Sequence, residues 1–352
     1  MNLTVNVQEG VMEVKRRLTI NDIAARAGVS RQTISRVMNN KGDVSEATRN
    51  QVLRIIQELG YQPSLQARSM ITRQTNTIAL LLPDITNPFF PEIVQGVEET
   101  LRDHGQNVFL FMTNEDVERE ITCIQMAQQY NVDGVILCSP RVDDANLRSL
   151  IPNMPPTVFL NRRLDIEGVY SVVIDAFQGS YDATKYLIQN GHRNIGIVVG
   201  PPRSLSGVQR LAGYKKAMAD HGIPLKENLI NEVQQFDELD VYKITKNFIK
   251  NQASAILTYN DPVAANMVQA CLDLKLNVPD DISIMGFDGV SLSKQVTPRL
   301  TTMAVPLFEI GVMLADMLIK VVKGEELIQR HVDIYPVLRV AQSTKAINKL
   351  RT

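Results

Sequence analysis

The sequence predicts a small all-α head followed by a larger α/β body of two doubly wound lobes with mainly parallel sheets. Three observations lead to this fold class. The first 75 residues show the spacing of short amphipathic helices. From Thr77 onward, short apolar runs alternate with amphipathic stretches, the pattern of strands joined by crossover helices. Among 352 residues, about ten such units exceed one open sheet, which favours two lobes with a cleft between them.

The head is predicted to contain three helices. Thr19 begins the first with the spacing of a capping box, and Gly28, which adopts a positive φ at little cost, ends it. Ser30 is a good N-cap for a second helix through about residue 38, and Ser45 caps a third that stops before Gly60. The apolar side chains expected to face the core of the head are Ile20, Ile23, Ala24, Ile34, Val37, Val52, Ile55, Ile56 and Leu59.

In the body, the predicted elements mostly follow one another in strand–helix order. Strands are expected at 78–82, 108–112, 135–138, 158–160, 172–174, 195–199, 255–257 and 282–287. Helices are expected at 91–104, 119–130, 177–190, 207–221, 262–274 and 307–322.

The formal charge of −1 is unevenly distributed. Residues 1–75 carry eleven basic and six acidic side chains, a net of +5, whereas the rest carries 26 basic and 32 acidic ones, a net of −6. A cationic head on an acidic body is typical of a nucleic-acid-binding module joined to a second function.

No segment of the sequence indicates export or membrane insertion. The apolar runs are shorter than the ~20 residues of a membrane-spanning helix, and residues 1–17 lack the apolar core of a signal peptide. The three scattered cysteines fit reduced thiols. We therefore expect a cytoplasmic protein without a membrane partner, whose translation starts at either Met1 or Met12.

The motifs of common enzymes and cofactor sites are missing from the sequence. No G-x-G-x-x-G follows the strands predicted at 78 and 195, and there is no P-loop, G-x-S-x-G or C-x-x-C pattern. The four histidines are far apart and lack the spacing of zinc ligands. The sequence therefore predicts no enzyme, no catalytic residue, no cofactor and no metal site.

A resemblance to a known family covers the head. Residues 18–70, LTINDIAARAGVSRQTISRVMNNKGDVSEATRNQVLRIIQELGYQPSLQARSM, resemble the headpiece and hinge of the lactose-repressor (LacI) family. The resemblance implies an extension at 1–17, a helix-turn-helix DNA-binding headpiece at 18–62, and a hinge helix with its linker at 63–75. It also implies a homodimer, or a tetramer, on near-palindromic double-stranded DNA.

The second helix of the head is expected to read the DNA major groove. With Ile34 and Val37 turned inward, its opposite face is open; there Gln32 could bond adenine, and Arg31 or Arg36 could bond guanine. Hydroxyls and amides at helix starts would hold phosphates. The predicted DNA-binding residues are Thr19, Ser30, Arg31, Gln32, Thr33, Ser35, Arg36, Asn39, Ser45, Arg49, Ala67 and Met70.

The hinge would act in the minor groove. A two-turn helix at 64–70 is marginal in water and should fold only on its partner. The family resemblance implies that two such helices pair through the small Ala67 and insert the apolar Met70 between base steps. The chain has Ser64 where the family commonly has Asn, and Met70 where Leu is common, which leaves the depth of the DNA kink open.

The body resembles the family's periplasmic-binding-protein-like core, in which a small molecule binds between two lobes. The resemblance includes PDITNPFFPEI, VDGVIL, RLAGY, YNDPVAANM, NVPDDISIMGFD and TPRLTT. It implies a core at 76–352, with an N-lobe at about 76–175 and 305–335 and a C-lobe at about 176–304 and 336–345. The chain should cross between the lobes near Asp175, Ala304 and Pro336.

The family's effector-contacting residues can be transferred position by position. Arg210 and Asp288 could each form bidentate hydrogen bonds with vicinal hydroxyls, and an aromatic face could stack on a sugar ring. Phe89 or Phe90 could instead belong to a core or an interface, and Asp261 could instead cap a helix. The predicted effector-binding residues are Asn87, Phe89, Phe90, Asn161, Arg162, Arg210, Phe236, Asn260, Asp261 and Asp288.

The sequence thus predicts a repressor whose operator affinity is controlled by a small molecule. A neutral sugar is the first choice, a sugar acid or phosphate the second because Arg162 and Arg163 adjoin the cleft, and a nucleobase the third. One alternative is a catabolite-control-type regulator with a phosphorylated carrier protein as co-regulator. A solute-binding protein or an enzyme is disfavoured by the headpiece. Induction and corepression remain open.

Overall fold

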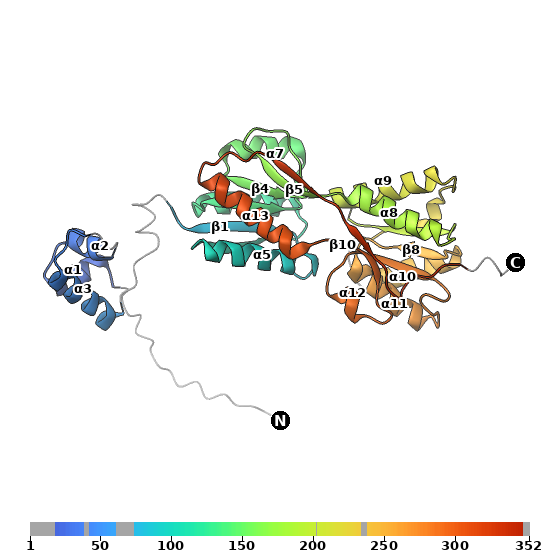
Figure 1. Ribbon diagram of the computed structural model, residues 1–352, viewed down its shortest axis with the longest axis horizontal. Helices are drawn as coiled ribbons and strands as arrows, with labels where there is room; N and C mark the ends of the chain where they lie inside the picture. Colours follow the sequence, from blue (N-terminus) through green and yellow to red (C-terminus); the bar gives the residue numbers. More distant parts are fainter. Residues whose placement is uncertain (1–17, 39–41, 61–73, 202, 234–237, 348–352) are drawn as a thin grey trace, which may run out of the picture. The chain divides into compact units, whose positions relative to one another are not determined.

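The computed structural model describes residues 18–38, 42–60, 74–201, 203–233 and 238–347 (Figure 1). It divides into two compact units, residues 1–75 and 76–352, which are described separately. Several predictions fall outside the described residues: the extension at 1–17, Asn39, the hinge residues Ala67 and Met70, and Phe236.

The head contains the three predicted helices, α1 (Ile20–Ala27), α2 (Arg31–Met38) and α3 (Glu46–Leu59). The backbone N–H and hydroxyl of Thr19 both donate to Asp22 at 2.7 Å, and Gly28 ends α1 at φ 65°. The hydroxyl oxygens of Ser30 and Ser45 accept from backbone N–H groups three residues later, at 3.1 and 3.3 Å. These caps orient the helices around a core of Ile23, Ala24, Ala27, Ile34, Val37, Val52 and Ile55.

The body contains two six-stranded sheets. The first has the order β11-β5-β4-β3-β1-β2 and is parallel throughout; its strands are β1 (Thr77–Leu82), β2 (Asn107–Met112), β3 (Gly134–Cys138), β4 (Thr157–Leu160), β5 (Tyr170–Ile174) and β11 (His331–Ile334). The second has the order β12-β10-β9-β8-β6-β7 and is parallel except for β12; its strands are β6 (Ile195–Val199), β7 (Ile230–Glu232), β8 (Ala255–Leu257), β9 (Ser283–Asp288), β10 (Thr301–Ala304) and β12 (Val337–Arg339).

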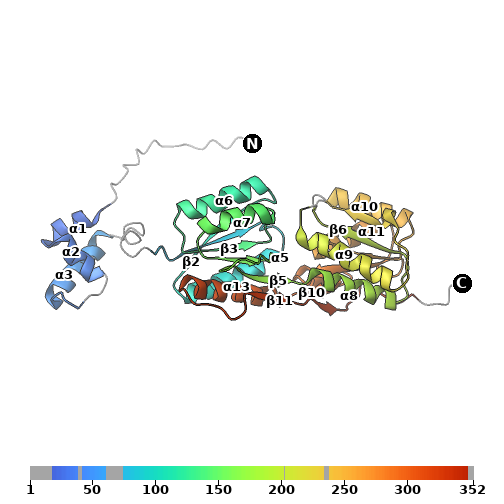
Figure 2. The same cartoon turned by 90° about the horizontal axis from the view of Figure 1, so that it is seen from above.

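Helices cover both faces of each sheet (Figure 2). On the first sheet, α5 (Phe89–Asp103) and α13 (Leu307–Val322) form one layer, and α6 (Val117–Gln129) and α7 (Asp144–Leu150) form the other. On the second sheet, the layers are α8 (Ala176–Gln189) with α9 (Leu205–Asp220), and α10 (Glu238–Lys250) with α11 (Asp261–Asp273). A short helix, α12 (Leu292–Gln295), follows β9.

This layering explains the continuous apolar strands. Ile78, Leu80 and Leu82 of β1 enter the core under α5 and α13, whereas Ala79 and Leu81 enter the core under α6. A strand buried on both faces cannot alternate with polar residues. The doubly wound fold class predicted for the body is therefore confirmed.

The chain passes between the two sheets three times: from β5 to α8, from β10 to α13, and from β11 to β12. The interlobe returns put α13, late in the sequence, against the early α5 (Figure 1). These helices cross closely because Gly96 and Gly311 lack side chains; a Cβ on Gly96 would lie 2.2 Å from the Phe308 carbonyl oxygen. Within the described part of the chain, no helix combines the length and the apolarity that a membrane span requires.

Candidate functional site

The first candidate site is the outer face of α2. Ile34 and Val37 are buried in the head, as predicted, and this orientation leaves Arg31 and Gln32 exposed. Thr33, Ser35 and Arg36 are half-buried on the same helix. An exposed Arg–Gln pair at the start of a helix has the donors and acceptors needed to contact base edges in a major groove.

Arg36 has a partner within the head. Its guanidinium lies 3.2 Å from the carboxylate of Asp43, and the two side chains are 43% and 54% exposed. Because exposed ion pairs are weak, DNA could replace Asp43 as the partner of Arg36.

The cap residues lie at the helix starts where phosphates were predicted to bind. Thr19, Ser30 and Ser45 are exposed. The hydroxyls of Ser30 and Ser45 also lie 2.9 and 2.8 Å from those of Thr33 and Thr48. Arg49 is half-buried on α3. A hydroxyl that accepts from the helix backbone retains a proton to donate, so capping and phosphate binding are compatible.

The second candidate site is a cavity between the two lobes of the body, at the carboxyl ends of the parallel strands. Its lining comes from both lobes and consists of Asn87, Phe89, Phe90, Glu115, Ser139, Arg141, Asn161, Ile174, Ala176, Ser206, Arg210, Tyr259 and Asp288. Six of the predicted effector-binding residues are brought together there: Asn87, Phe89, Phe90, Asn161, Arg210 and Asp288.

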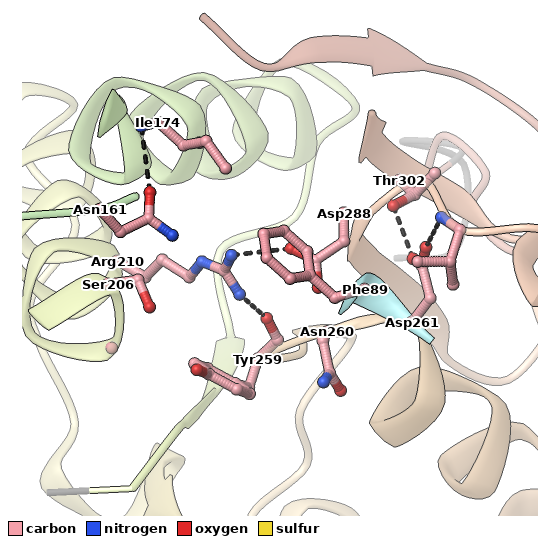
Figure 3. Close-up of polar contacts among 12 residues, drawn as sticks. Phe89, Asn161, Ile174, Ser206, Arg210, Tyr259, Asn260, Asp261, Asp288 and Thr302 are labelled. Carbon is pink, nitrogen blue, oxygen red and sulfur yellow. Dashed lines mark hydrogen bonds and ion pairs between the residues drawn. The ribbon is translucent and has the colours of Figure 1, made fainter. Parts of the chain in front are cut away.

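An ion pair dominates the second lobe's side of the cavity (Figure 3). Arg210 donates to Asp288 at 2.8 Å and to the carbonyl oxygen of Tyr259, and its guanidinium lies 3.7 Å from the centroid of the Phe287 ring. Both side chains of the pair are nearly inaccessible, at 9% and 5% exposed. Burial raises the pKa of Asp288, whereas the adjacent Arg210 lowers it. Arg210 Nε is buried without a hydrogen-bond partner among the described residues.

Asn161 lies on the first lobe's side and is held at both ends of its amide. Its nitrogen donates to the Ser139 hydroxyl at 3.1 Å. Its oxygen accepts from the backbone N–H of Ile174 at 3.1 Å (Figure 3). Because the amide spans the ends of three strands, its orientation toward the cavity is fixed before any ligand arrives.

Four residues of the lining have a left-handed backbone. Their φ angles are 59° for Glu115, 47° for Ser139, 58° for Asn161 and 95° for Asp288. Left-handed non-glycine residues are uncommon, and backbone strain gathers at functional sites. All four follow or end a strand, so this strain aims their side chains at the common cavity.

One charged pair of the lining, Arg141 with Glu115, was not among the predicted effector-binding residues. Arg141 donates to the Glu115 carboxylate and, at 2.7 Å, to the carbonyl oxygen of Ser139. The buried Glu120 carboxylate holds the segment by accepting from the Arg141 backbone N–H at 2.7 Å. A signal was present: Glu115 and Arg141 each stand three residues after a predicted strand, where parallel strands present functional groups.

Tyr259 was also missed. A Cβ on Gly200 would lie 2.2 Å from the Tyr259 ring, so the ring occupies its place only because position 200 is glycine. The phenol oxygen lies 3.1 Å from the hydroxyl of Ser204, which caps α9. An aromatic ring beside Arg210 therefore faces the cavity.

Arg162 lies outside the lining, unlike its neighbour Asn161. Its guanidinium donates to Asp144 at 2.7 Å and to the carbonyl oxygen of Pro140 at 2.8 Å, and thus fastens the segment before α7. Arg163 pairs with Asp333 at 2.6 Å. Both guanidinium groups are thus paired with carboxylates that do not line the cavity.

Asn260 and Asp261 also lie outside the lining. Asn260 caps α11 by accepting from the backbone N–H of Val263 at 3.1 Å. Asp261 accepts from the Thr302 hydroxyl at 2.6 Å and from the backbone N–H of Val290 at 2.9 Å (Figure 3). Burial, together with the nearby Asp288, raises the pKa of Asp261 to about 7. Both residues support the strand ends behind the cavity.

Comparisons with known proteins cover nearly the whole chain. Residues 19–64 match the family of bacterial regulatory proteins, lacI family, and residues 75–340 match the periplasmic binding proteins and sugar binding domain of the LacI family. The chain is 32% identical to the HTH-type transcriptional regulator DegA of Bacillus subtilis, over 94% of this chain and 99% of that protein. It is 31% identical to catabolite control protein A of Priestia megaterium (93% and 99%) and 33% identical to the ribose operon repressor of Halalkalibacterium halodurans (93% and 97%).

Solved structures agree with this assignment. The complex of the transcriptional regulator CelR with cellobiose superposes with a TM-score of 0.68 at 30% identity, covering 93% of this chain and 100% of that one. The lac repressor dimer bound to operator and an anti-inducer has the same fold, with a TM-score of 0.82 at 24% identity and coverage of 94% and 100%. This chain belongs to the LacI family of DNA-binding transcription regulators, which are not enzymes.

Proposed function

We propose that this regulator is a cytoplasmic, dimeric repressor of a near-palindromic operator, controlled by a neutral carbohydrate in the interlobe cavity. The observation that carries this proposal is the charge balance of the cavity. Its lining contains two guanidinium groups, Arg141 and Arg210, and two carboxylates, Glu115 and Asp288. Each arginine is paired with one of the carboxylates.

A balanced lining favours a neutral ligand over an acid or a phosphate. An anion would need an unpaired cation, and the nearby Arg162 and Arg163 are paired with carboxylates outside the cavity. The remaining lining supplies amide and hydroxyl groups for hydroxyl recognition and aromatic rings for the apolar faces of a sugar. Phe89 and Phe90 already pack edge to face, with ring centroids 5.0 Å apart. Relatives named for cellobiose and ribose support the same ligand class.

The cavity volume of about 30 Å³ is far below the ~300–1,000 Å³ of typical ligand pockets. A sugar would therefore have to separate the lobes or displace the paired side chains. In either case the sugar would bind one conformation of the protein more tightly than the other. An effector needs such a difference in affinity to shift operator binding. The three interlobe connections would carry such a change.

Dimerisation is supported by exposed apolar side chains on the edge strand of the first lobe. Strand β2 exposes Phe109 at 45%, next to Tyr130 at 55%, and exposes Leu110 at 43% on its opposite face. Exposed apolar surface on a sheet edge is a hazard unless a partner covers it. We expect a second copy to do so, and Leu110→Lys to give monomers in sedimentation experiments. If the Leu110→Lys protein still sediments as a dimer, the dimer interface lies elsewhere.

The proposal is tested by selecting operator sites from random duplexes and titrating the complex with neutral sugars and their acid or phosphate counterparts. We expect a neutral sugar, such as cellobiose or ribose, to raise the melting temperature and change operator affinity. Arg141→Gln should remove the response, and the exposed Arg148→Gln should retain it. A response confined to a charged sugar or a nucleobase would overturn the neutral-ligand assignment.

A second function is favoured by the similarity to catabolite control protein A. In that case, a phosphorylated carrier protein docking on the N-lobe, rather than a sugar in the cleft, would change operator affinity. A pull-down with phosphorylated and unphosphorylated carrier distinguishes the two functions. Retention of the phosphorylated carrier alone, together with unchanged operator affinity across the sugar panel, would favour this second function.

A further inference from the structure

The second lobe has another cavity, whose lining shares no residue with that of the interlobe cleft. Its volume is about 330 Å³, larger than that of the cleft. It is formed where α12 and the following loop meet the end of β12, and its lining consists of Ser293, Lys294, Arg299, Leu300, Arg339, Val340, Ala341 and Gln342.

Three cations and no acidic residue line this cavity. Lys294, Arg299 and Arg339 come from three separate segments, and all three are exposed. None of them forms an ion pair with a carboxylate of the described residues, in contrast to Arg141 and Arg210 of the cleft. Like charges gathered without a counter-charge repel one another, so an anion in this cavity would be bound favourably.

The loop geometry keeps the cations in place. The backbone N–H of Arg299 donates to the Gln342 side chain at 3.2 Å, and its carbonyl oxygen accepts from the Gln342 backbone N–H at 2.9 Å. Ser293 donates to the Val290 carbonyl oxygen at 2.7 Å and so fixes the start of α12. The three cations therefore project from backbone that is tied together around the cavity.

We propose that this cavity binds the phosphate group of a small phosphorylated metabolite. Guanidinium groups match phosphate oxygens in pairs, and the lysine adds a point charge. A bare phosphate would leave most of the volume empty. The apolar Leu300, Val340 and Ala341 offer a wall for an organic remainder, which favours a phosphate monoester over the inorganic ion.

Binding at this cavity would change the position of a segment that lines the cleft. Arg339 donates to the carbonyl oxygen of Gly289 at 3.4 Å, and Gly289 follows Asp288, the partner of Arg210. An anion that draws Arg339 toward itself competes with this long hydrogen bond. The site would thus bias the position of the segment that presents Asp288, independently of what occupies the cleft.

The probes are glycerol 3-phosphate, inorganic phosphate and glycerol, titrated calorimetrically into the full chain in phosphate-free buffer. We expect glycerol 3-phosphate to bind more tightly than inorganic phosphate and glycerol not to bind. Arg299→Gln and Arg339→Gln should each weaken binding by about tenfold or more, while Lys323→Gln, an exposed cation of the other lobe, should not. Unchanged melting temperatures would show that the variants are folded.

Two outcomes would overturn the proposal. Loss of binding in Arg141→Gln but not in Arg299→Gln would place the anion in the cleft. Phosphate that acts only by dissociating dimers would mean that an acidic side chain of a second copy fills the cavity. Neither result depends on a sugar effector, so failure of the carbohydrate proposal leaves this test intact.

Discussion

Two ion pairs contrast the chemistry of the head with that of the body. Arg36 and Asp43 lie 3.2 Å apart with about half of each side chain in water, whereas Arg210 and Asp288 lie 2.8 Å apart with less than a tenth exposed. The exposed pair is readily exchanged, which suits a residue that must leave its partner for DNA. The buried pair cannot be separated without a substitute for each charge. The head can therefore exchange contacts one by one, but the cleft must rearrange as a unit.

Asp288→Ala should have the largest effect. Removing the carboxylate leaves the Arg210 guanidinium buried without its counter-charge, which costs about 3–5 kcal/mol of unfolding free energy. Denaturant unfolding of the body, followed by fluorescence or circular dichroism, measures the loss. A loss below about 1 kcal/mol would mean that the pair is effectively solvated and that the contrast with Arg36–Asp43 is false.

A second buried carboxylate differs from that of Asp288, because no Lys or Arg of the described residues is paired with it. Asp261 is bonded by Thr302 and Val290, and its pKa is raised to about 7 by burial. The folded state thus holds a proton that the unfolded state releases near the ordinary aspartate pKa of 3.8. Stability from this group is fully present below about pH 4 and is lost as pH rises through 7, by on the order of a few kcal/mol.

Asp261→Asn is the check on this assignment. The amide cannot ionise, so the fall in unfolding free energy between pH 5 and pH 8 should become shallower in the variant than in the parent chain. The control is Asp43→Asn, in the exposed pair of the head. Parallel pH profiles for Asp261→Asn and the parent would show that Asp261 titrates normally.

Sequence patterns predicted the strands that are mostly apolar and missed short strands that contain polar or charged side chains. The eight predicted strands are apolar runs, whereas the missed β10 buries Thr301 and Thr302 completely. Their hydroxyls are satisfied by Thr344 and Asp261. No local pattern reveals such distant partners, because a threonine in a strand is equally suited to solvent.

The cleft was predictable only in part for a related reason. Asn161 and Arg162 are adjacent in sequence, but the left-handed backbone at Asn161 sends one side chain to the cavity and the other to Asp144. Charge and position made both equally plausible as ligand contacts. Family resemblance supplied Arg210 and Asp288, but their mutual pairing is a property of the folded lobe.

Substitutions in the predicted base-reading residues of the head should have an intermediate effect, on DNA discrimination. Arg31→Ala and Gln32→Ala are each expected to lose ~1–3 kcal/mol of discrimination between operator and random DNA, because both side chains are exposed on α2. Competition binding with the two DNAs measures it. Arg54→Ala is the control, since its guanidinium is paired with Glu58 on α3. Equal losses of affinity for operator and random DNA in Gln32→Ala would mean that Gln32 does not recognise specific bases.

Asp43→Ala should give the smallest change in stability. It also tests most directly whether Arg36 can exchange Asp43 for DNA. The exposed pair should contribute less than about 1 kcal/mol to the unfolding free energy. Removing the carboxylate also removes a negative charge near DNA and frees Arg36, so affinity should rise for both operator and random duplexes. A specific loss of operator affinity would instead mean that Asp43 orients Arg36 for a base, and that the exposed pair, like the buried one, is held for its geometry.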